Sequence, residues 1–179
     1  TKTLISRIEY LINDAGVRPE EITAVTFTNQ AASEMHERLE KRLGKRAAAK
    51  ITLGTFHAIC LGLLGSVRVI SEGEALDIAE ELLRSLGRKM GAKKLVSAVS
   101  KIKNGVAAPY GETGAELYEA YCARLRELGV LDFDDLLSEA LNLNTVGRKS
   151  FKNLLIDEFQ DINDMQFELI KARSMSADS

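Results

Sequence analysis

The sequence predicts an α/β fold in which a parallel sheet is interrupted by a helical insertion. Three observations predict it: helix and strand patterns alternate over residues 1–64, only helical patterns occur from 72 to about 142, and a strand pattern returns at 153–157. Alternating helices and strands are typical of parallel sheets with helical crossovers, so the helical stretch between them indicates an inserted subdomain.

The first elements follow from hydrophobic spacing. Apolar residues at helical intervals predict a one-sided helix over 2–15, which Gly16 and Pro19 end. The short β-branched run 22–27 predicts a buried strand, and apolar residues spaced three to four apart predict a second helix that ends near Gly44.

The later elements of the α/β part are equally short. Residues 51–53 predict a second strand and residues 56–64 a third helix. Three apolar residues before two acids predict the strand at 153–157, and residues 163–173 predict a closing helix.

Composition excludes several classes of protein. The 179 residues are 45% hydrophobic and 28% charged, which excludes disordered and fibrous chains, and no apolar run could cross a membrane. The two cysteines, Cys60 and Cys122, form no metal or disulfide pattern, which predicts a reduced, cytoplasmic protein. A net charge of −2 excludes a globally basic nucleic-acid binder but permits a local basic patch.

Charge is unevenly distributed along the helical stretch. Seven basic residues and no acidic one lie between Arg84 and Lys103, whereas residues 112–139 carry eight acidic residues and two arginines. The two segments are either solvated faces of opposite sign or, for the basic run, a surface that contacts nucleic-acid phosphates.

The pair Asp157-Glu158 is the strongest local signal for chemistry. The apolar run 154–156 carries these carboxylates to the carboxyl end of a strand, where open α/β sheets bind ligands. Asp157 could bind a hard cation such as Mg²⁺, and Glu158 could take a proton from an attacking water. The alternative is an ordinary solvated loop.

Two strand ends share the dipeptide Thr-Phe, 29 residues apart, which predicts similar groups side by side at one edge of the sheet. Thr28 or Asn29 could cap the next helix, and Phe27 could offer its ring to a nucleic-acid base. Thr55 could cap its own helix, and His57 could donate to a phosphate. Capped helices and core aromatics are the alternative interpretation.

A second acidic cluster lies in residues 131–137, which read Leu-Asp-Phe-Asp-Asp-Leu-Leu. The pattern predicts three carboxylates in the first turn of a helix. Because the helix dipole favours negative charge there, a structural role is the preferred interpretation.

Four segments together resemble a known family. Residues 24–35, 54–60 and 155–163 resemble motifs Ia, Ib and II of the UvrD/Rep/PcrA superfamily 1 DNA helicases, and residues 131–137 resemble that family's LDFDDLL stretch. The segments occur in family order, and the resemblance covers essentially the whole chain. It implies a RecA-like P-loop NTPase sheet with helices on both faces, plus an all-α inserted subdomain.

The resemblance also implies domain boundaries and a function. The motor core would comprise 1–66 and 129–179, and the insertion 67–128. The parent protein would use ATP and Mg²⁺ to move 3′ to 5′ on single-stranded DNA and to separate duplex at single-strand/double-strand junctions, with no membrane partner.

The resemblance assigns roles to residues at these positions. Thr1 and Asp157 would bind the nucleotide-associated Mg²⁺, and Glu158 would polarise the attacking water. The single-strand track would be lined by Phe27, Thr28, Asn29, Thr55 and His57. The basic run, with Lys93 and Lys94, would lie near the duplex.

The ends of the chain raise a further expectation. Thr1 would be the last residue of the family's Gly-x-Gly-Lys-Thr loop, and the motif III strand would follow Ser179, so we expect a fragment that hydrolyses no ATP alone. The bridge at Gly65-Ser66 is shorter than in the family. Without neighbouring strands, residues 153–157 would form an exposed edge through which the fragment self-associates.

Two other functions stay open. One is the motor half of a RecB- or AddA-like helicase–nuclease, and the other is a helical protein-interaction module with a degenerate nucleotide site. The intact pair Asp157-Glu158 argues against the second, since a degenerate site needs neither carboxylate.

Overall fold

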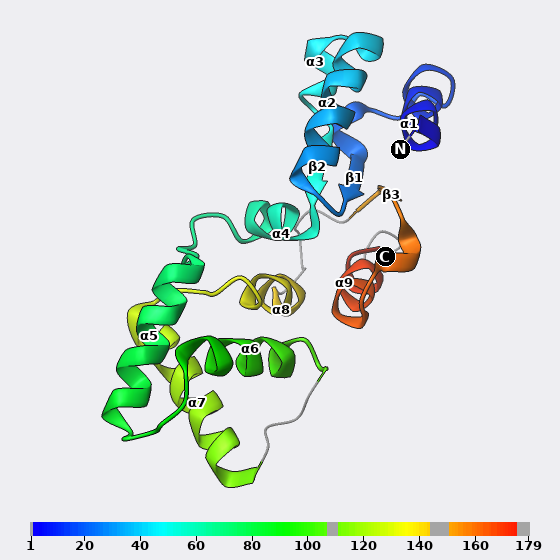
Figure 1. Cartoon of the computed structure of the whole chain (residues 1–179). Helices are drawn as coiled ribbons and strands as arrows, with labels where there is room; N and C mark the ends of the chain where they lie inside the picture. The colour runs from blue at the N-terminus through cyan, green and yellow to red at the C-terminus, as the bar shows by residue number, and fades with distance from the viewer. Residues whose placement is uncertain (1, 107–110, 144–150, 175–179) are drawn as a thin grey trace. The chain divides into compact units, whose positions relative to one another are not determined.

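The computed structural model describes residues 2–106, 111–143 and 151–174, which fall into two compact units (Figure 1). The core unit comprises Thr1–Leu64 with Glu139–Ser179, and the helical unit comprises Gly65–Ser138. The family resemblance instead implies an insertion of residues 67–128, and that boundary stays a prediction. Within the described ranges, no helix is long and apolar enough to cross a bilayer.

The core unit is built on a three-stranded parallel sheet, as the alternating pattern predicts. Its strands are β1 (Ile22–Thr26), β2 (Thr52–Thr55) and β3 (Asn153–Ile156), in the order β2-β1-β3. All five residues of β1 are buried, as befits a central strand covered on both faces. The predicted mixed α/β class and all three strands are confirmed.

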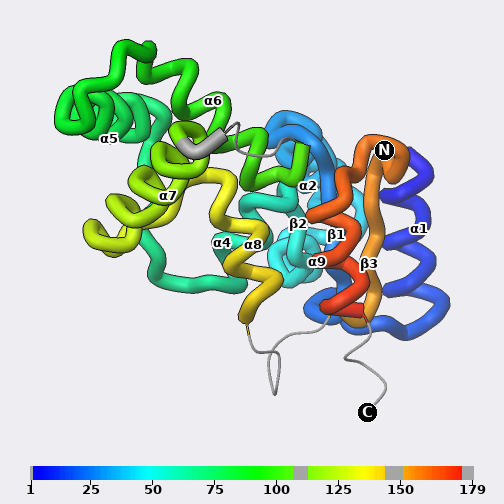
Figure 2. The backbone as a smooth tube through the Cα atoms, turned by 90° about the horizontal axis from the view of Figure 1, so that it is seen from below, coloured from blue at the N-terminus to red at the C-terminus, as the bar shows by residue number. Residues whose placement is uncertain are grey.

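Among the described residues, the core unit contains the helices α1 (Lys2–Asn13), α2 (Asn29–Leu43), α3 (Lys45–Ala48), α4 (Phe56–Leu64) and α9 (Asp164–Ser174), together with the end of a helix that begins in the helical unit. Figure 2 shows α1 and α9 on opposite sides of β3. Apolar side chains of α1 and α2 pack on alternate strand residues in one cluster, which includes Ile5, Ile8, Ile22, Ala24, Met35 and Leu39. Helix α3 was not predicted, because its four residues show no apolar periodicity.

An acidic side chain joins the starts of two strands. Glu21, in the 3₁₀ turn η1 (Pro19–Glu21) before β1, accepts hydrogen bonds from Arg18 at 2.7 Å and from Lys152 at 3.0 Å. Lys152 directly precedes β3. The hydrogen bonds from Arg18 and Lys152 lower the pKa of Glu21 to about 2.

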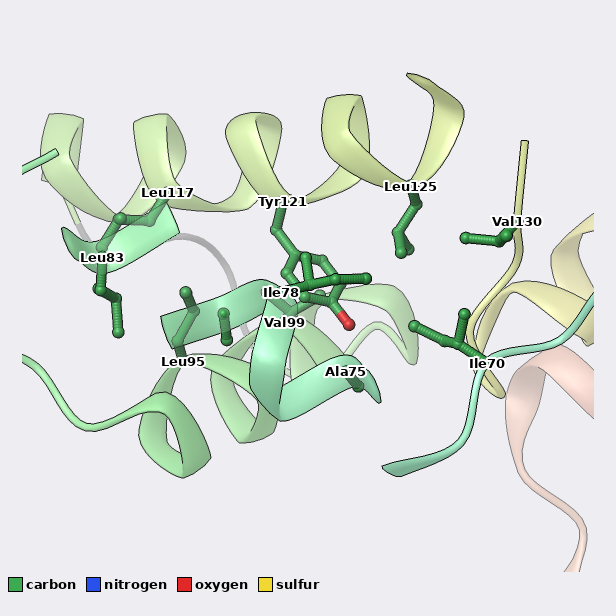
Figure 3. Close-up of a cluster of buried hydrophobic side chains, with 11 residues drawn as sticks. Ile70, Ala75, Ile78, Leu83, Leu95, Val99, Leu117, Tyr121, Leu125 and Val130 are labelled. Carbon is green, nitrogen blue, oxygen red and sulfur yellow. The ribbon is translucent and has the colours of Figure 1, made fainter. Parts of the chain in front are cut away.

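The helical unit contains α5 (Glu72–Ser85), α6 (Ala92–Lys103), α7 (Gly111–Leu128) and the start of α8 (Asp135–Asn142). Figure 3 shows side chains from α5, α6 and α7 meeting in a single apolar cluster around Tyr121. The only strand-like pairing in its described residues is an isolated bridge, so the expectation of a helical insertion without a true strand agrees with the structure.

That bridge joins the two points where the chain enters and leaves the helical unit. Val69 pairs in parallel with Leu131. The Ile70 N–H donates to the Leu131 carbonyl at 2.8 Å, and the Leu131 N–H donates to the Arg68 carbonyl at 2.9 Å. The two ends of the insertion are thus held side by side.

A buried lysine ties α6 to the segment before α8. The Nζ of Lys103 lies 2.7 Å from both Asp132 Oδ2 and Asp135 Oδ1, and its side chain is only 7% exposed. Burial alone would lower the pKa of Lys103, but these carboxylates outweigh burial and raise it. Asn104 adds a hydrogen bond from its side-chain amide to Asp134 at 2.8 Å, so several polar contacts hold residues 132–135 against the end of α6.

The expected arrangement of the 131–137 carboxylates is corrected by this geometry. Helix α8 begins at Asp135, so Asp132 and Asp134 lie before its first turn. Asp132 accepts the Asp135 N–H at 3.0 Å, and Asp135 accepts the Asp132 N–H at 3.1 Å. These carboxylates therefore have structural contacts, in line with the preferred interpretation. The contacts are the reciprocal capping of Asp132 and Asp135 and their ion pairs with Lys103, and not an interaction of all three with the helix dipole.

Candidate functional site

Three polar segments follow the carboxyl ends of the three strands. In the register of the sheet, Thr26 pairs with Thr55, and Val25 pairs with Ile156, the last residue of β3. Parallel strands lie about 4.8 Å apart, so the segments that follow are neighbours along one edge. The predicted alignment of residues 26–29 with 55–57 is confirmed, and Asp157 adjoins them on the other side of β1.

The turn from β1 into α2 fixes the first segment. The buried hydroxyl of Thr26 donates to the Thr28 carbonyl at 3.1 Å. The Thr28 hydroxyl accepts the Ala31 N–H at 3.1 Å and caps α2, so of the two predicted caps Thr28 is used. Asn29 is the first residue of α2 and is exposed.

An aromatic pair links the first two segments. The half-buried ring of Phe27 meets the buried ring of Phe56 edge to face, with centroids 6.3 Å apart and planes at 68°. Thr55 accepts the Ala58 N–H at 3.3 Å as the predicted cap of α4, and the half-buried His57 follows in that helix. The buried ring of Phe56 therefore packs against the ring of Phe27, and Phe27 itself remains partly exposed to solvent.

The third segment holds the two carboxylates. The Asp157 N–H donates to the Val25 carbonyl at 3.0 Å, which extends the pairing of β3 with β1 by one residue. Asp157 is half-buried, whereas Glu158 is exposed and adopts a left-handed backbone with φ 53° and ψ 53°. Asp157 and Glu158 therefore differ in burial, and Glu158 has a left-handed backbone; their distinct roles stay a prediction.

Asp157 provides the kind of ligand that Mg²⁺ prefers. This ion takes one or two protein carboxylates and completes its shell with phosphate oxygens and waters. In the part of the chain that the structure describes, no three His, Cys, Asp or Glu side chains gather as a metal site, so an all-protein cage is absent there. Thr1, the other predicted ligand, lies outside the described residues.

The basic run 84–103 is only partly available for a ligand. Arg88 pairs with Glu116 at 2.6 Å, and Lys103 is buried between its two aspartates. Lys93 and Lys94 are exposed on α6, with Lys101 further along the same helix. Arg84 at the end of α5 and Lys89 in the segment after it are exposed as well, so the exposed cations of this run are spread over α5, α6 and the segment between them.

Sequence reasoning missed two polar contacts. Gln160 donates its side-chain amide to Glu158 Oε2 at 2.6 Å, a contact that depends on the left-handed turn at Glu158. The ion pairs of Lys103 join residues far apart in the chain. No local spacing in the sequence signals either contact.

A model of one protein family, described as the UvrD/REP helicase N-terminal domain, matches residues 1–69 and 68–176. The two matched stretches meet close to Gly65-Ser66, where the sequence predicts a shortened bridge.

Several helicases share sequence with nearly the whole chain. Identity is 34% to the ATP-dependent DNA helicase Rep of Escherichia coli K12, 31% to UvrD1 of Mycobacterium tuberculosis H37Rv and 28% to PcrA of Staphylococcus aureus NCTC 8325, each over 96% of this chain. The chain spans only 30%, 26% and 27% of these proteins. The alignment with Rep runs over 200 positions, so Rep contains residues that this chain of 179 lacks.

Proposed function

This chain belongs to the UvrD/REP helicase N-terminal domain family, and we propose that it forms the first motor domain of an ATP-dependent DNA helicase, with an inserted helical subdomain. The core unit then contains a RecA-like P-loop NTPase sheet, and the insertion, residues 67–128, lies within the helical unit. The parent protein moves 3′ to 5′ on single-stranded DNA and separates duplex.

The observation that carries this proposal is the register of the three strands. It places Asp157-Glu158 and the segment 26–29 on one edge, joined through the hydrogen bond from Asp157 N–H to the Val25 carbonyl. Val25 lies only two residues before Phe27. The carboxylate segment is therefore hydrogen-bonded directly to the strand that carries the aromatic ring.

In the proposed hydrolysis, Asp157 holds the Mg²⁺ that accompanies ATP, and Glu158 accepts a proton from the attacking water. When bound, the cation neutralises charge that develops on the transferred phosphate. The half-buried Asp157 is anchored by its backbone to the sheet, which suits a ligand. The exposed Glu158 stands one residue further on, where water reaches it.

DNA would bind along the ends of β1 and β2. Phe27 presents part of its ring for stacking on a base, while Thr28, Asn29, Thr55 and His57 provide polar groups for the backbone. The exposed lysines of α6, Lys93 and Lys94, would add phosphate contacts in the helical unit.

The first test measures ATP hydrolysis by the complete protein that contains this chain, with and without single-stranded DNA. We expect DNA to stimulate hydrolysis, and Glu158→Gln to lower it at least about 100-fold because a general base contributes that much. Binding of ATP should change less than threefold. Absence of any DNA-stimulated hydrolysis in the unaltered protein would refute the function, and loss of ATP binding in the variant would make Glu158 structural.

The second test addresses the DNA track. Phe27→Ala should weaken binding of a fluorescent oligonucleotide about tenfold, since stacking of one base on an aromatic ring contributes about 1–3 kcal/mol. Phe167→Ala is the matched control, because that ring is 48% exposed on α9 and has no role in the proposed track. Equal affinities for the two variants would remove Phe27 from the track.

A further inference from the structure

Within the described residues, the side chain of Glu158 is hydrogen-bonded by that of Gln160. The Nε2 of Gln160 donates to Glu158 Oε2 at 2.6 Å, short for a bond between an amide and a carboxylate. Both residues are exposed, so neither is needed to fill the core. The contact therefore calls for an explanation other than packing.

The backbone around Glu158 is fixed on both sides. Before it, the Asp157 N–H is bonded to the Val25 carbonyl of the central strand at 3.0 Å. After it, the Asp161 N–H donates to the Glu158 carbonyl at 2.9 Å and closes the 3₁₀ turn η2 (Phe159–Asp161). Among the described residues Glu158 is the only non-glycine with positive φ, a conformation that the surrounding structure has to impose.

The left-handed turn brings Gln160 within reach. A strand followed by a helical continuation would send the side chains at 158 and 160 apart, whereas the reversal at Glu158 folds residue 160 back towards it. The turn thus imposes strain at Glu158 and at the same time creates the contact. Strained backbone of this kind occurs at sites where the position of one side chain matters.

The chemistry of the contact suits a general base. With its backbone fixed, a glutamate still rotates about three side-chain bonds, and a hydrogen bond at one oxygen restricts that rotation. An amide donor holds the carboxylate without neutralising it, unlike a lysine or an arginine. Oε2 is used by Gln160, and within the described residues no protein donor binds Oε1, which is left for water.

We propose that Gln160 is a positioning residue that orients the Glu158 carboxylate towards the attacking water. The proposal rests on the proposed function, because it assigns Gln160 a role through the general base. It predicts an effect on the rate of the chemical step and none on nucleotide binding.

The experiment measures kcat and KM for ATP in the complete protein at saturating single-stranded DNA. Gln160→Ala should lower kcat about tenfold, the loss expected for a hydrogen bond to a charged group that is open to solvent, with KM changed less than twofold. Gln160→Glu keeps the shape but removes the donor, so it should lose at least as much activity. Activity retained by the glutamate variant would show that shape matters and would overturn the proposal.

A double-mutant cycle separates positioning from folding. Glu158→Asp shortens the carboxylate so that residue 160 no longer reaches it, and adding Gln160→Ala in that background should change kcat less than twofold. An equal loss in both backgrounds, or a rise in KM alone, would overturn the proposal. If the unaltered protein shows no DNA-stimulated hydrolysis, the proposed function fails; if Glu158 is essential but Gln160→Ala is silent, only this inference fails.

Discussion

The buried ion pairs of Lys103 provide the sharpest test of how the helical unit is held together. Lys103→Met removes the ammonium but keeps an unbranched apolar stem of similar length. It leaves Asp132 and Asp135, whose side chains are 11% and 21% exposed, without their cation. The ammonium also lies 5.7 Å from the centre of the Tyr121 ring, so the substitution removes a cation–π interaction as well.

The expected cost follows from this burial. Breaking a buried ion pair on one side costs about 3–5 kcal/mol, and the partial exposure and capping bonds of the aspartates place the value near 3 kcal/mol. That is a large part of the stability of a unit this size, at roughly 0.1 kcal/mol per residue. Because the pKa of Lys103 is raised, its contribution is complete at neutral pH and declines only as pH rises beyond about 10.5.

Urea unfolding at pH 7 measures the destabilisation. The chain has no tryptophan, and three of its four tyrosines, Tyr110, Tyr118 and Tyr121, belong to residues 65–138, so tyrosine fluorescence reports mainly on the helical unit. Circular dichroism follows both units. Lys101→Met is the matched control, an exposed lysine on the same helix, and should change stability by less than about 0.5 kcal/mol. A destabilisation under about 1 kcal/mol for Lys103→Met would refute the reasoning.

Three other predictions concern the surface of the chain. Replacing Lys93 and Lys94 with alanine should flatten the salt dependence of DNA binding, by about one unit of log affinity per log salt for each phosphate that is no longer neutralised; an unchanged slope would mean a solvated face. Glu21, whose pKa is lowered to about 2, stabilises the fold above pH 4.5 and loses that effect as pH falls towards 2, so the urea midpoint should drop less between pH 6 and 3 in Glu21→Gln than in the unaltered chain. Since β3 pairs only with β1 in the described sheet, the chain should self-associate through β3 or cover it with a terminus; a monomer by light scattering, with rapid amide exchange at Leu155 and Ile156, would contradict this.

The local sequence pattern predicts the helices and strands of the core unit well, because the residue types of each segment clearly favour one secondary structure. The β-branched run at 22–27 became a fully buried central strand, and the two threonine caps at Thr28 and Thr55 follow from their places before helices. Helix α3 escaped prediction because four residues carry too little periodicity. The ion pair between Lys103 and Asp132 could not be predicted from local spacing, because it joins residues far apart in the chain.

The sequence predicts which residues form the candidate site better than it predicts the contacts between them. Residue type and position after a strand identify Asp157, Glu158 and Phe27 from sequence alone. The edge-to-face support of Phe27 by Phe56 depends on the register of two strands. The contact of Gln160 with Glu158 depends on one positive φ angle at a residue that seldom adopts it, which no spacing rule anticipates.

The bridge between Val69 and Leu131 has a consequence for how the chain folds. Pairing β3 with β1 requires closure of a loop of roughly 100 residues after β2, and the entropy cost of closure grows with the logarithm of its length. If the helical unit forms first, the bridge already holds Val69 beside Leu131, so the loop that must close before β3 can pair with β1 has an effective length of roughly 40 residues. The shorter loop lowers the entropic cost of this pairing by about 1 kcal/mol. Because helices have local contacts and such contacts form early, we expect the insertion to fold before the sheet that it interrupts.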